Sequence, residues 1–306
     1  MTKRIAPFVF LCLFAMPLLA RQEHILIARP ARSRAVGAAV GLGVNVPLVA
    51  RLIGAGSTLY ISTVDISNNN PTNTEVDFYL DGVDLTTLAP ISVNGVIQTR
   101  GLNGLMAARS TAHFSDFIDA LVQGGILPAS VEPNGFIGSV LFVFNGYSLS
   151  GQGGATVRFY SSFGGGTIGQ ALRGHEMSNN EPQSLVASFY DTRGQSGPQL
   201  YPNMFINNTG LTPLGGVASG PVGIHIQAYA DSTGLTVGVP LDTAIGTGQT
   251  VGVNDVLTRL QVPAGEDTVI VFVTVTSGTA AIAGVSAEVD ATTRDGTTVD
   301  MSRADF

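Results

Sequence analysis

The sequence predicts an all-β protein made of two tandem β-sandwich domains, each with one short helix. Charged residues are 12 % of the chain, whereas an average globular protein has about 25 %. The 38 glycines and the many short alternating runs are typical of strands joined by turns. The pattern of residues 115–121 returns in residues 254–260, and this repetition indicates a duplicated domain.

Residues 1–20 have the pattern of a secretory signal peptide. Lys3 and Arg4 provide a positive start, residues 5–20 are almost wholly apolar, and Ala20 is the small residue that cleavage favours. An uncleaved anchor is the alternative, but the stretch is shorter than the ~20 residues that span a bilayer. After cleavage we expect no membrane span. The protein should be secreted or at the cell surface, with the periplasm as a second destination.

The cysteine and charge content narrow the chemistry of the mature chain. Cys12 is the only cysteine and lies inside the predicted signal, so we expect no disulfide, no thiolate nucleophile and no cysteine metal site. The formal net charge is −7, and Lys3 is the only lysine. Such an acidic chain disfavours nucleic acid as a partner, because the phosphate backbone attracts positive charge.

The first sandwich is predicted over residues 44–174, after a flexible leader over residues 21–43. An almost continuous apolar run at 135–144 predicts a central strand covered on both faces. Residues 96–109 include a surplus over the second copy, and we expect any specific binding loop there. The other strands are predicted from alternation and β-rich composition at 44–52, 59–67, 76–80, 91–98 and 155–162.

A polar linker over residues 175–183 is predicted to precede the second sandwich, over residues 184–306. Its strands are expected at 184–190, 200–208, 222–230, 268–276 and 281–290.

Each copy also has one short amphipathic helix, at residues 115–121 and 254–260. We predict Ser115 and Asn254 as the capping residues, each followed by an Asp whose charge favours the helix start. If the two helices are equivalent, Phe117 and Val256 cannot both be exposed to solvent.

The order of these features resembles that of uncharacterised secreted bacterial proteins with duplicated immunoglobulin-like β-sandwich domains. The resemblance covers residues 44–306 and is one of pattern. It depends on the Asn-rich turn at residues 68–73 and on the helix at 115–121 before the long apolar strand at 135–144. It implies an exported all-β protein of two tandem immunoglobulin-like β-sandwich domains, and it brings no catalytic residues.

Three catalytic or cofactor motifs are incomplete in this sequence. Residues 164–169 match the spacing of a dinucleotide loop, but residues 170–174 are too short for the helix that must follow. His175 and Glu176 begin a zinc-protease motif whose second histidine is replaced by Asn179. Ser148 lacks both the glycine and the helix of a nucleophile elbow. We therefore predict no enzyme activity.

Carboxylates could in principle bind calcium or form a catalytic pair. Asp81 and Asp84 are the candidates for a weak calcium site, although their spacing is not that of a dedicated calcium loop. Apart from that calcium, we predict no cofactor. Turn and helix-start roles are simpler explanations for the group as a whole. A catalytic pair would have to come from Asp77, Asp81, Asp84, Asp116 and Asp119.

Tyrosines could provide a flat platform for sugars, although half-buried tyrosine is also ordinary at the margin of a sandwich core. The candidates, on or beside predicted strands, are Tyr60, Tyr79, Tyr160, Tyr190, Tyr201 and Tyr229.

The prediction for function is an exported, non-enzymatic structural or adhesive β-sandwich protein at or outside the cell surface. The alternatives are a carbohydrate- or surface-binding module and a glycan hydrolase with paired carboxylates. Expected partners are a cell-surface polysaccharide or protein.

Overall fold

The computed structural model describes residues 23–29, 41–53, 59–147, 149–163, 166–177, 182–214, 216–290 and 296–304. Strands make up 59 % of the structure and helices 5 %, so the predicted all-β class is confirmed. The predicted signal peptide, residues 1–20, lies outside the described residues. Among those that are described, no helix is both long enough and apolar enough to cross a membrane.

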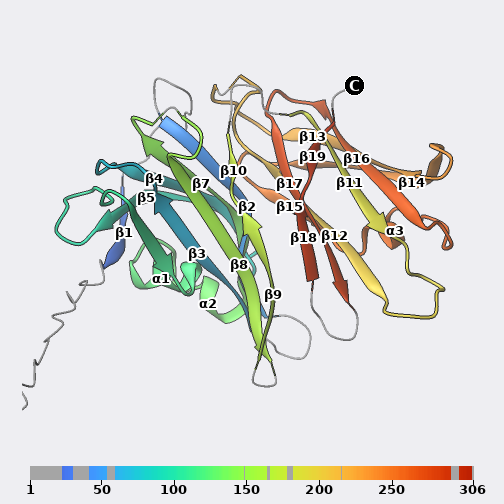
Figure 1. The fold of residues 1–306 in the computed structure, drawn as a ribbon, viewed down its shortest axis with the longest axis horizontal. Coiled ribbons are helices and arrows are strands. Elements are labelled where there is room, and N and C mark those ends of the chain that lie inside the picture. Colours follow the sequence, from blue (N-terminus) through green and yellow to red (C-terminus); the bar gives the residue numbers. More distant parts are fainter. Residues whose placement is uncertain are drawn as a thin grey trace, which may run out of the picture.

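The N-terminal half is one ten-stranded antiparallel sheet that folds back into two layers (Figure 1). One layer has the order β1-β5-β4-β7-β2-β10 and the other the order β6-β3-β8-β9. The layers join where residues 51–53 of β2 pair with β3. The strands are β1 (His24–Ala28), β2 (Gly41–Ile53), β3 (Leu59–Asn68), β4 (Val76–Asp84), β5 (Pro90–Thr99), β6 (Ser110–Phe114), β7 (Gly135–Asn145), β8 (Gly153–Phe163), β9 (Gly166–Arg173) and β10 (His175–Glu176).

The C-terminal half has two separate antiparallel sheets, one with the order β14-β13-β16-β11-β19 and one with the order β15-β12-β17-β18. Figure 1 shows this half, in yellow to red, beside the blue to green N-terminal half. The strands are β11 (Ser184–Tyr190), β12 (Leu200–Asn208), β13 (Val222–Ala230), β14 (Thr236–Ile245), β15 (Thr250–Val253), β16 (Thr268–Ser277), β17 (Ile282–Asp290), β18 (Gly296–Asp300) and β19 (Ser302–Arg303).

The two halves have the same strand order. The series β5-β4-β7-β2-β10 corresponds to β14-β13-β16-β11-β19, and the series β6-β3-β8-β9 corresponds to β15-β12-β17-β18. Helix α1 (Phe117–Gln123) lies between β6 and β7 in the chain, as α3 (Val256–Arg259) lies between β15 and β16. A further short helix, α2 (Val131–Asn134), follows α1. The repetition seen in the sequence is therefore present in the backbone pairing as well.

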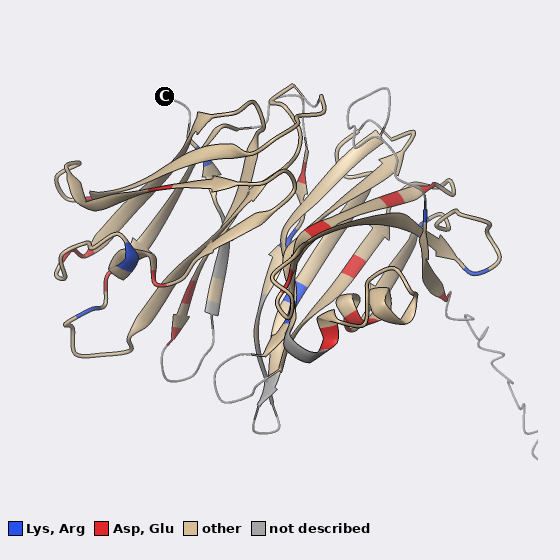
Figure 2. Cartoon of the chain, turned by 180° about the vertical axis from the view of Figure 1, so that it is seen from behind, with Lys and Arg blue, Asp and Glu red and all other residues tan. Residues whose placement is uncertain are grey.

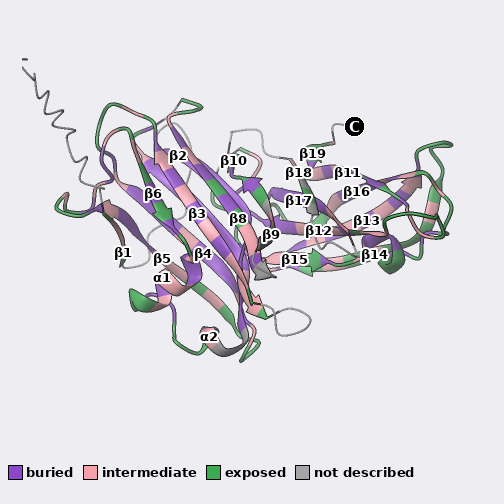
Figure 3. Ribbon diagram, turned by 60° about the horizontal axis from the view of Figure 1, so that its bottom comes forward, coloured by how far each residue is buried: buried purple, intermediate pink, exposed green. Residues whose placement is uncertain are grey.

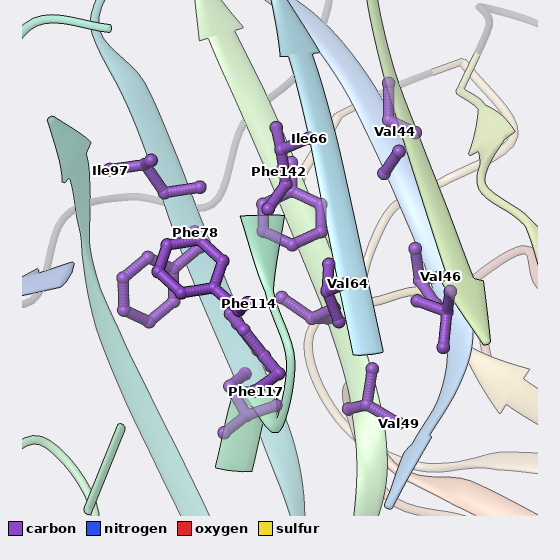
Figure 4. Packing of buried hydrophobic residues seen from close by; sticks show 14 of the residues in the cluster. Val44, Val46, Val49, Val64, Ile66, Phe78, Ile97, Phe114, Phe117 and Phe142 are labelled. Atoms are coloured by element: carbon purple, nitrogen blue, oxygen red, sulfur yellow. The ribbon is translucent and has the colours of Figure 1, made fainter. Parts of the chain in front are cut away.

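Each half encloses its own apolar core, and α1 contributes the central side chain of the first one. Phe117 is fully buried and meets Phe78, Phe114 and Phe142 edge to face, with ring centroids 6.4, 5.8 and 6.1 Å away (Figure 4). Such edge-to-face contacts add to the hydrophobic gain of burying the rings. Val256 of α3 is also fully buried, so the prediction that Phe117 and Val256 are not both exposed is confirmed.

The caps of the two helices lie one residue later than predicted. Asp116 is itself the cap of α1, because its Oδ1 accepts the Asp119 amide at 3.1 Å, and its Oδ2 accepts the Arg51 Nε at 3.0 Å. Asp255 caps α3 in the left-handed region, at φ 46°, without a side-chain capping bond. Ser, Asn and Asp are about equally good caps, so two such residues in succession leave the position of the cap open by one residue.

The outer face of β2 and β7 packs against β12, β15 and β17 of the other half. At this junction the Asn207 Nδ2 donates to the Ser139 Oγ at 2.8 Å, and the Asn45 Nδ2 donates to the Asn207 Oδ1 at 3.3 Å. All three side chains are fully buried. The C-terminal half thus covers β7 from outside, and the prediction of a strand buried on both faces is confirmed for residues 135–144 except Ile137, which is half-buried. Figure 3 shows the buried segments along β2, β3 and β4.

A break in the β2 ladder also shapes the junction. The register of β2 against β7 shifts between Val46 and Val49, because Pro47 has no amide hydrogen to donate to a ladder. The Pro47 carbonyl turns to the other half and accepts the Thr250 Oγ1 at 2.8 Å. Leu48, within this irregularity, lines a cavity between the halves.

Parts of the predicted leader, linker and binding loop are regular or packed structure. Strand β1 lies within the predicted leader and pairs with β5, and β10 lies within the predicted linker and pairs with β2. In residues 96–109, Val96, Ile97 and Met106 are buried, and Met106 exchanges two backbone hydrogen bonds with Thr74 at 2.7 and 3.0 Å. Residues 96–99 therefore belong to β5, and Met106 is part of the first apolar core.

Candidate functional site

A cavity of about 470 Å³ able to hold a ligand lies where the two halves meet. Aliphatic side chains of β2, among them Leu48 and Leu52, form one wall, and residues of β12 form the opposite wall. Its volume is within the range of small-molecule sites, about 300–1,000 Å³. We call this cavity the junction groove.

Four aromatic rings, two from each half, line the junction groove. Tyr60 and Phe159 come from the paired strands β3 and β8, and their rings stack with centroids 5.4 Å apart and planes at 26°. Tyr201 and Phe205 come from β12. They lie four residues apart on one face of the strand, since side chains alternate along it. Tyr201 is 43 % exposed, so its ring is accessible to a ligand.

Polar groups gather at the start of α3, at one part of the junction groove. Asn203, Asn254 and Asp255 line it. The backbone amide of Asp255 donates to the Asn203 Oδ1 at 3.0 Å. The Asn203 Nδ2 donates to the Tyr201 carbonyl at 3.3 Å and has a second hydrogen that can be donated beside the groove. Asp and Asn tolerate the left-handed region better than other side chains, so Asp255 can adopt this turn. The groove therefore offers amide donors and a carboxylate next to aromatic surfaces.

An ion pair supports this region from the end of β11. Asp191 accepts the Arg193 Nε and Nη2, each at 2.8 Å, and its side chain is fully buried. Burial acts to raise the pKa of Asp191, but the hydrogen bonds and charge of Arg193 outweigh it and lower that pKa below its ordinary value. The pKa of Arg193 is raised, chiefly by its hydrogen bond to Asp191 and with a smaller contribution from the charge of Asp255.

The pKa of Glu288, in β17, is shifted in the opposite direction to that of Asp191. Burial raises the pKa of Glu288 above its ordinary value, and the hydrogen bond from the Tyr190 amide, at 2.6 Å, offsets this only in part.

These two shifts predict opposite pH dependences of stability. The lowered pKa of Asp191 contributes stability above its unfolded-state pKa, and this contribution is lost as the pH falls through the folded-state value. The raised pKa of Glu288 favours the folded state below its unfolded-state pKa, and this contribution is lost as the pH rises through the folded-state value. We expect Asp191→Asn to destabilise the protein at neutral pH and Glu288→Gln to stabilise it.

Urea unfolding of both variants and the wild type at about pH 7 and about pH 3 measures these effects. Both differences should shrink at the acidic pH. A destabilised Glu288→Gln variant at neutral pH would show that the hydrogen bond from the Tyr190 amide outweighs burial.

The two calcium candidates have separate structural partners. Asp84 closes the turn after β4, since its Oδ1 accepts the Thr86 amide at 2.7 Å and its Oδ2 accepts the Ser130 hydroxyl at 2.9 Å. Burial acts to raise the pKa of Asp84, but these hydrogen bonds outweigh it and lower that pKa. Asp81 accepts the Ser92 hydroxyl. In the described part of the chain, no three His, Cys, Asp or Glu residues are grouped so as to hold a metal ion.

The other carboxylates considered for catalysis lie away from the junction groove. Asp77 accepts the Asn145 Nδ2 at 2.8 Å, and Asp116 and Asp119 belong to the start of α1. Among the described residues that line the groove, Asp255 is the one carboxylate. Glycoside hydrolysis commonly requires two carboxyl groups on either side of the bond.

The structure brings two of the six candidate tyrosines, Tyr60 and Tyr201, together in the junction groove. The other four tyrosines do not line the groove. Tyr79 packs against the apolar cluster at the junction, and Tyr160 lies under the Arg158 guanidinium. Tyr190 is 63 % exposed, and Tyr229 contacts Phe272.

Sequence reasoning did not find the polar residues of the groove. The alternation of Tyr201, Asn203 and Phe205 along β12 could have indicated a shared face, whereas Asn254 and Asp255 reach the groove only through tertiary packing. Comparison of the chain with protein-family models found no matching family, and comparison with curated proteins found no significant match. The junction groove is therefore the basis for assigning a function.

Proposed function

We propose that this protein is an exported, non-enzymatic adhesive module that binds carbohydrate at the cell surface in the junction groove. The observation that carries the proposal is the meeting of aromatic rings from both halves beside the amides of Asn203 and Asn254 and the carboxylate of Asp255. Export is supported by the signal-like pattern of residues 1–20. The repeated strand order supports two tandem immunoglobulin-like sandwich domains.

The groove matches the amphipathic character of a sugar ring. One face of a pyranose carries C–H groups that stack on aromatic rings, and Tyr201 offers such a ring with its hydroxyl available to water. The sugar hydroxyls require donors and acceptors, which Asn and Asp side chains supply. Small-molecule sites are usually lined by many apolar groups and a few polar ones, and the junction groove has this composition.

A structural role without a ligand is the second candidate. It is favoured by the buried hydrogen bonds among Asn45, Ser139 and Asn207, which join the halves into one unit. A glycan hydrolase is less well supported, because Asp255 is the one carboxylate among the described lining residues.

Titration with a panel of polysaccharides tests the proposal. We expect saturable binding by the wild type and a loss of about tenfold in affinity for Tyr201→Ala, because a stacked ring contributes about 1 kcal/mol or more. Tyr190→Ala is the matched control, since this ring is more exposed than Tyr201 and lies outside the groove. It should bind as the wild type does.

The outcomes separate the candidates. No saturable binding across the panel would favour the structural role, and release of reducing ends would favour the hydrolase. Recovery of the native chain from the cytoplasm with residues 1–20 intact would contradict export.

A further inference from the structure

An outward-facing apolar patch on the N-terminal half is covered by the C-terminal half. Leu141 and Val143 of β7 are buried in a cluster with Met177 and Leu211, and Tyr79 of β4 packs against it. Leu211 comes from the segment after β12. Without the C-terminal half, these side chains would lie on the outside of a sheet.

The repeated strand order places the same kinds of side chain on the C-terminal half. Tyr79 is the cross-strand partner of Leu141, and Tyr229 of β13 is the cross-strand partner of Ile270 of β16. Two residues after Ile270, Phe272 occupies the position of Val143. A tyrosine, a large aliphatic residue and a third apolar residue are therefore repeated.

In the C-terminal half this patch is partly exposed. Tyr229, Ile270 and Phe272 are each half-buried, whereas Leu141 is 1 % and Val143 2 % exposed. The rings of Tyr229 and Phe272 meet edge to face at 5.4 Å. We call the side of β11, β13 and β16 that carries them the outer C-terminal face.

We infer that a second copy of this chain covers the outer C-terminal face, with the same face of each copy packed against the other about a two-fold axis. Such self-complementary contacts are the commonest way in which soluble proteins form dimers. Two sheets pack face to face about 10 Å apart when apolar side chains interdigitate. Tyr229, Ile270 and Phe272 provide these side chains.

The charge on this face permits the contact. The polar side chains beside the apolar patch include Ser188, His225, Gln227 and Asp242, and Asp242 is the one acid among these four. His225 is held by Asp242 of the neighbouring strand β14, at 2.8 Å. In Figure 2 the strands of the C-terminal half are mostly tan. Although the whole chain is acidic, two such faces can approach with little repulsion between like charges.

A head-to-tail chain of copies is a poorer alternative. In such a chain, the layer of β3 and β8 from one copy would pack on the outer C-terminal face of the next copy, in the way that β12 and β17 pack on the N-terminal half within one copy. At the junction, Phe205 and Val285 are cross-strand partners, but the corresponding pair on the N-terminal half is Asp65 and Thr156. Burying Asp65, whose side chain pairs with His113 at 2.7 Å, beneath an apolar face would cost the hydration of its carboxylate.

Edge-to-edge pairing through β14 is also disfavoured. Pro240 lies in this strand and cannot donate to a new ladder. The neighbouring Val239 amide already donates to the Leu260 carbonyl at 2.7 Å, and Gly238 has φ 71°. The broken edge leaves the sheet face as the surface for a second copy.

Sedimentation equilibrium of the purified chain, over a range of concentrations, tests the inference. We expect a reversible monomer–dimer equilibrium for the wild type. Phe272→Lys should weaken the dimer by at least about a hundredfold, because it would bury an ammonium without a partner. Thr156→Lys is the matched control on the exposed face of β8 and should leave the dimer unchanged.

Thermal unfolding followed by circular dichroism shows whether each variant is folded. If Phe272→Lys does not fold, Thr274→Lys replaces a half-buried residue of the same strand and should weaken the dimer as well. A wild type that stays monomeric at all concentrations would overturn the inference. Loss of association in Thr156→Lys as well as in Phe272→Lys would instead establish head-to-tail assembly, in which both faces are buried. Neither variant changes the junction groove, so sugar binding is tested separately.

Discussion

Replacing Phe117 with alanine is expected to lower the free energy of unfolding by about 4 kcal/mol, the largest effect of a single substitution that we predict. The ring is fully buried and touches Phe78, Phe114 and Phe142 at the centre of the first core. Its removal forfeits the transfer free energy of the ring and leaves a cavity. Three rigid rings around that cavity cannot collapse into it without leaving their rotamers.

Urea unfolding followed by tyrosine fluorescence or circular dichroism measures this loss. Leu235→Ala is the control, because this side chain is 67 % exposed, and its unfolding free energy should change by less than about 0.5 kcal/mol. A loss below about 2 kcal/mol for Phe117→Ala would mean that α1 shifts to fill the space.

Asn207→Ala is expected to destabilise the protein by about 3 kcal/mol, because it leaves buried polar groups without partners. The Asn207 amide joins β12 to Ser139 of β7 and accepts the Asn45 Nδ2 from β2. It also donates to the Gln249 carbonyl at 2.9 Å. Water cannot readily replace these bonds, since Asn45 and Ser139 are fully buried.

Asn254→Ala, at an exposed position, is the matched control in denaturant unfolding. A second readout is limited proteolysis of the segment between the halves, which should accelerate in Asn207→Ala because the junction opens. Equal stability of the two variants would show that the junction does not depend on this amide.

Strands with a clear alternation, such as β13, could be predicted from the sequence because their pattern is local, whereas β6, β14 and β15 were not predicted. Val222, Ile224 and Ile226 are buried, and the residues between them face outward, as the alternation requires. The continuous apolar run of β7 was also interpretable, although the sequence could not show that the C-terminal half is what covers it. The duplication was visible because α1 and α3 repeat a pattern within otherwise strand-rich sequence.

The junction and its groove could not be predicted because they depend on contacts between distant residues. Asn45 and Asn207 are 162 positions apart, and neither has a local signal that differs from an ordinary turn or strand residue. Strand β1 was missed for another reason. Its five residues form a strand because they pair with the edge strand β5. So short a segment is too brief to show the alternation that predicts a strand.

For the proposed adhesive function, the break in β2 at Pro47 has a mechanical consequence. The residues of this break provide Leu48 to the groove and the Pro47 carbonyl to Thr250. The groove is lined by residues of both halves, so a force applied to the proposed ligand would be distributed over both sheets instead of separating one strand from its neighbour.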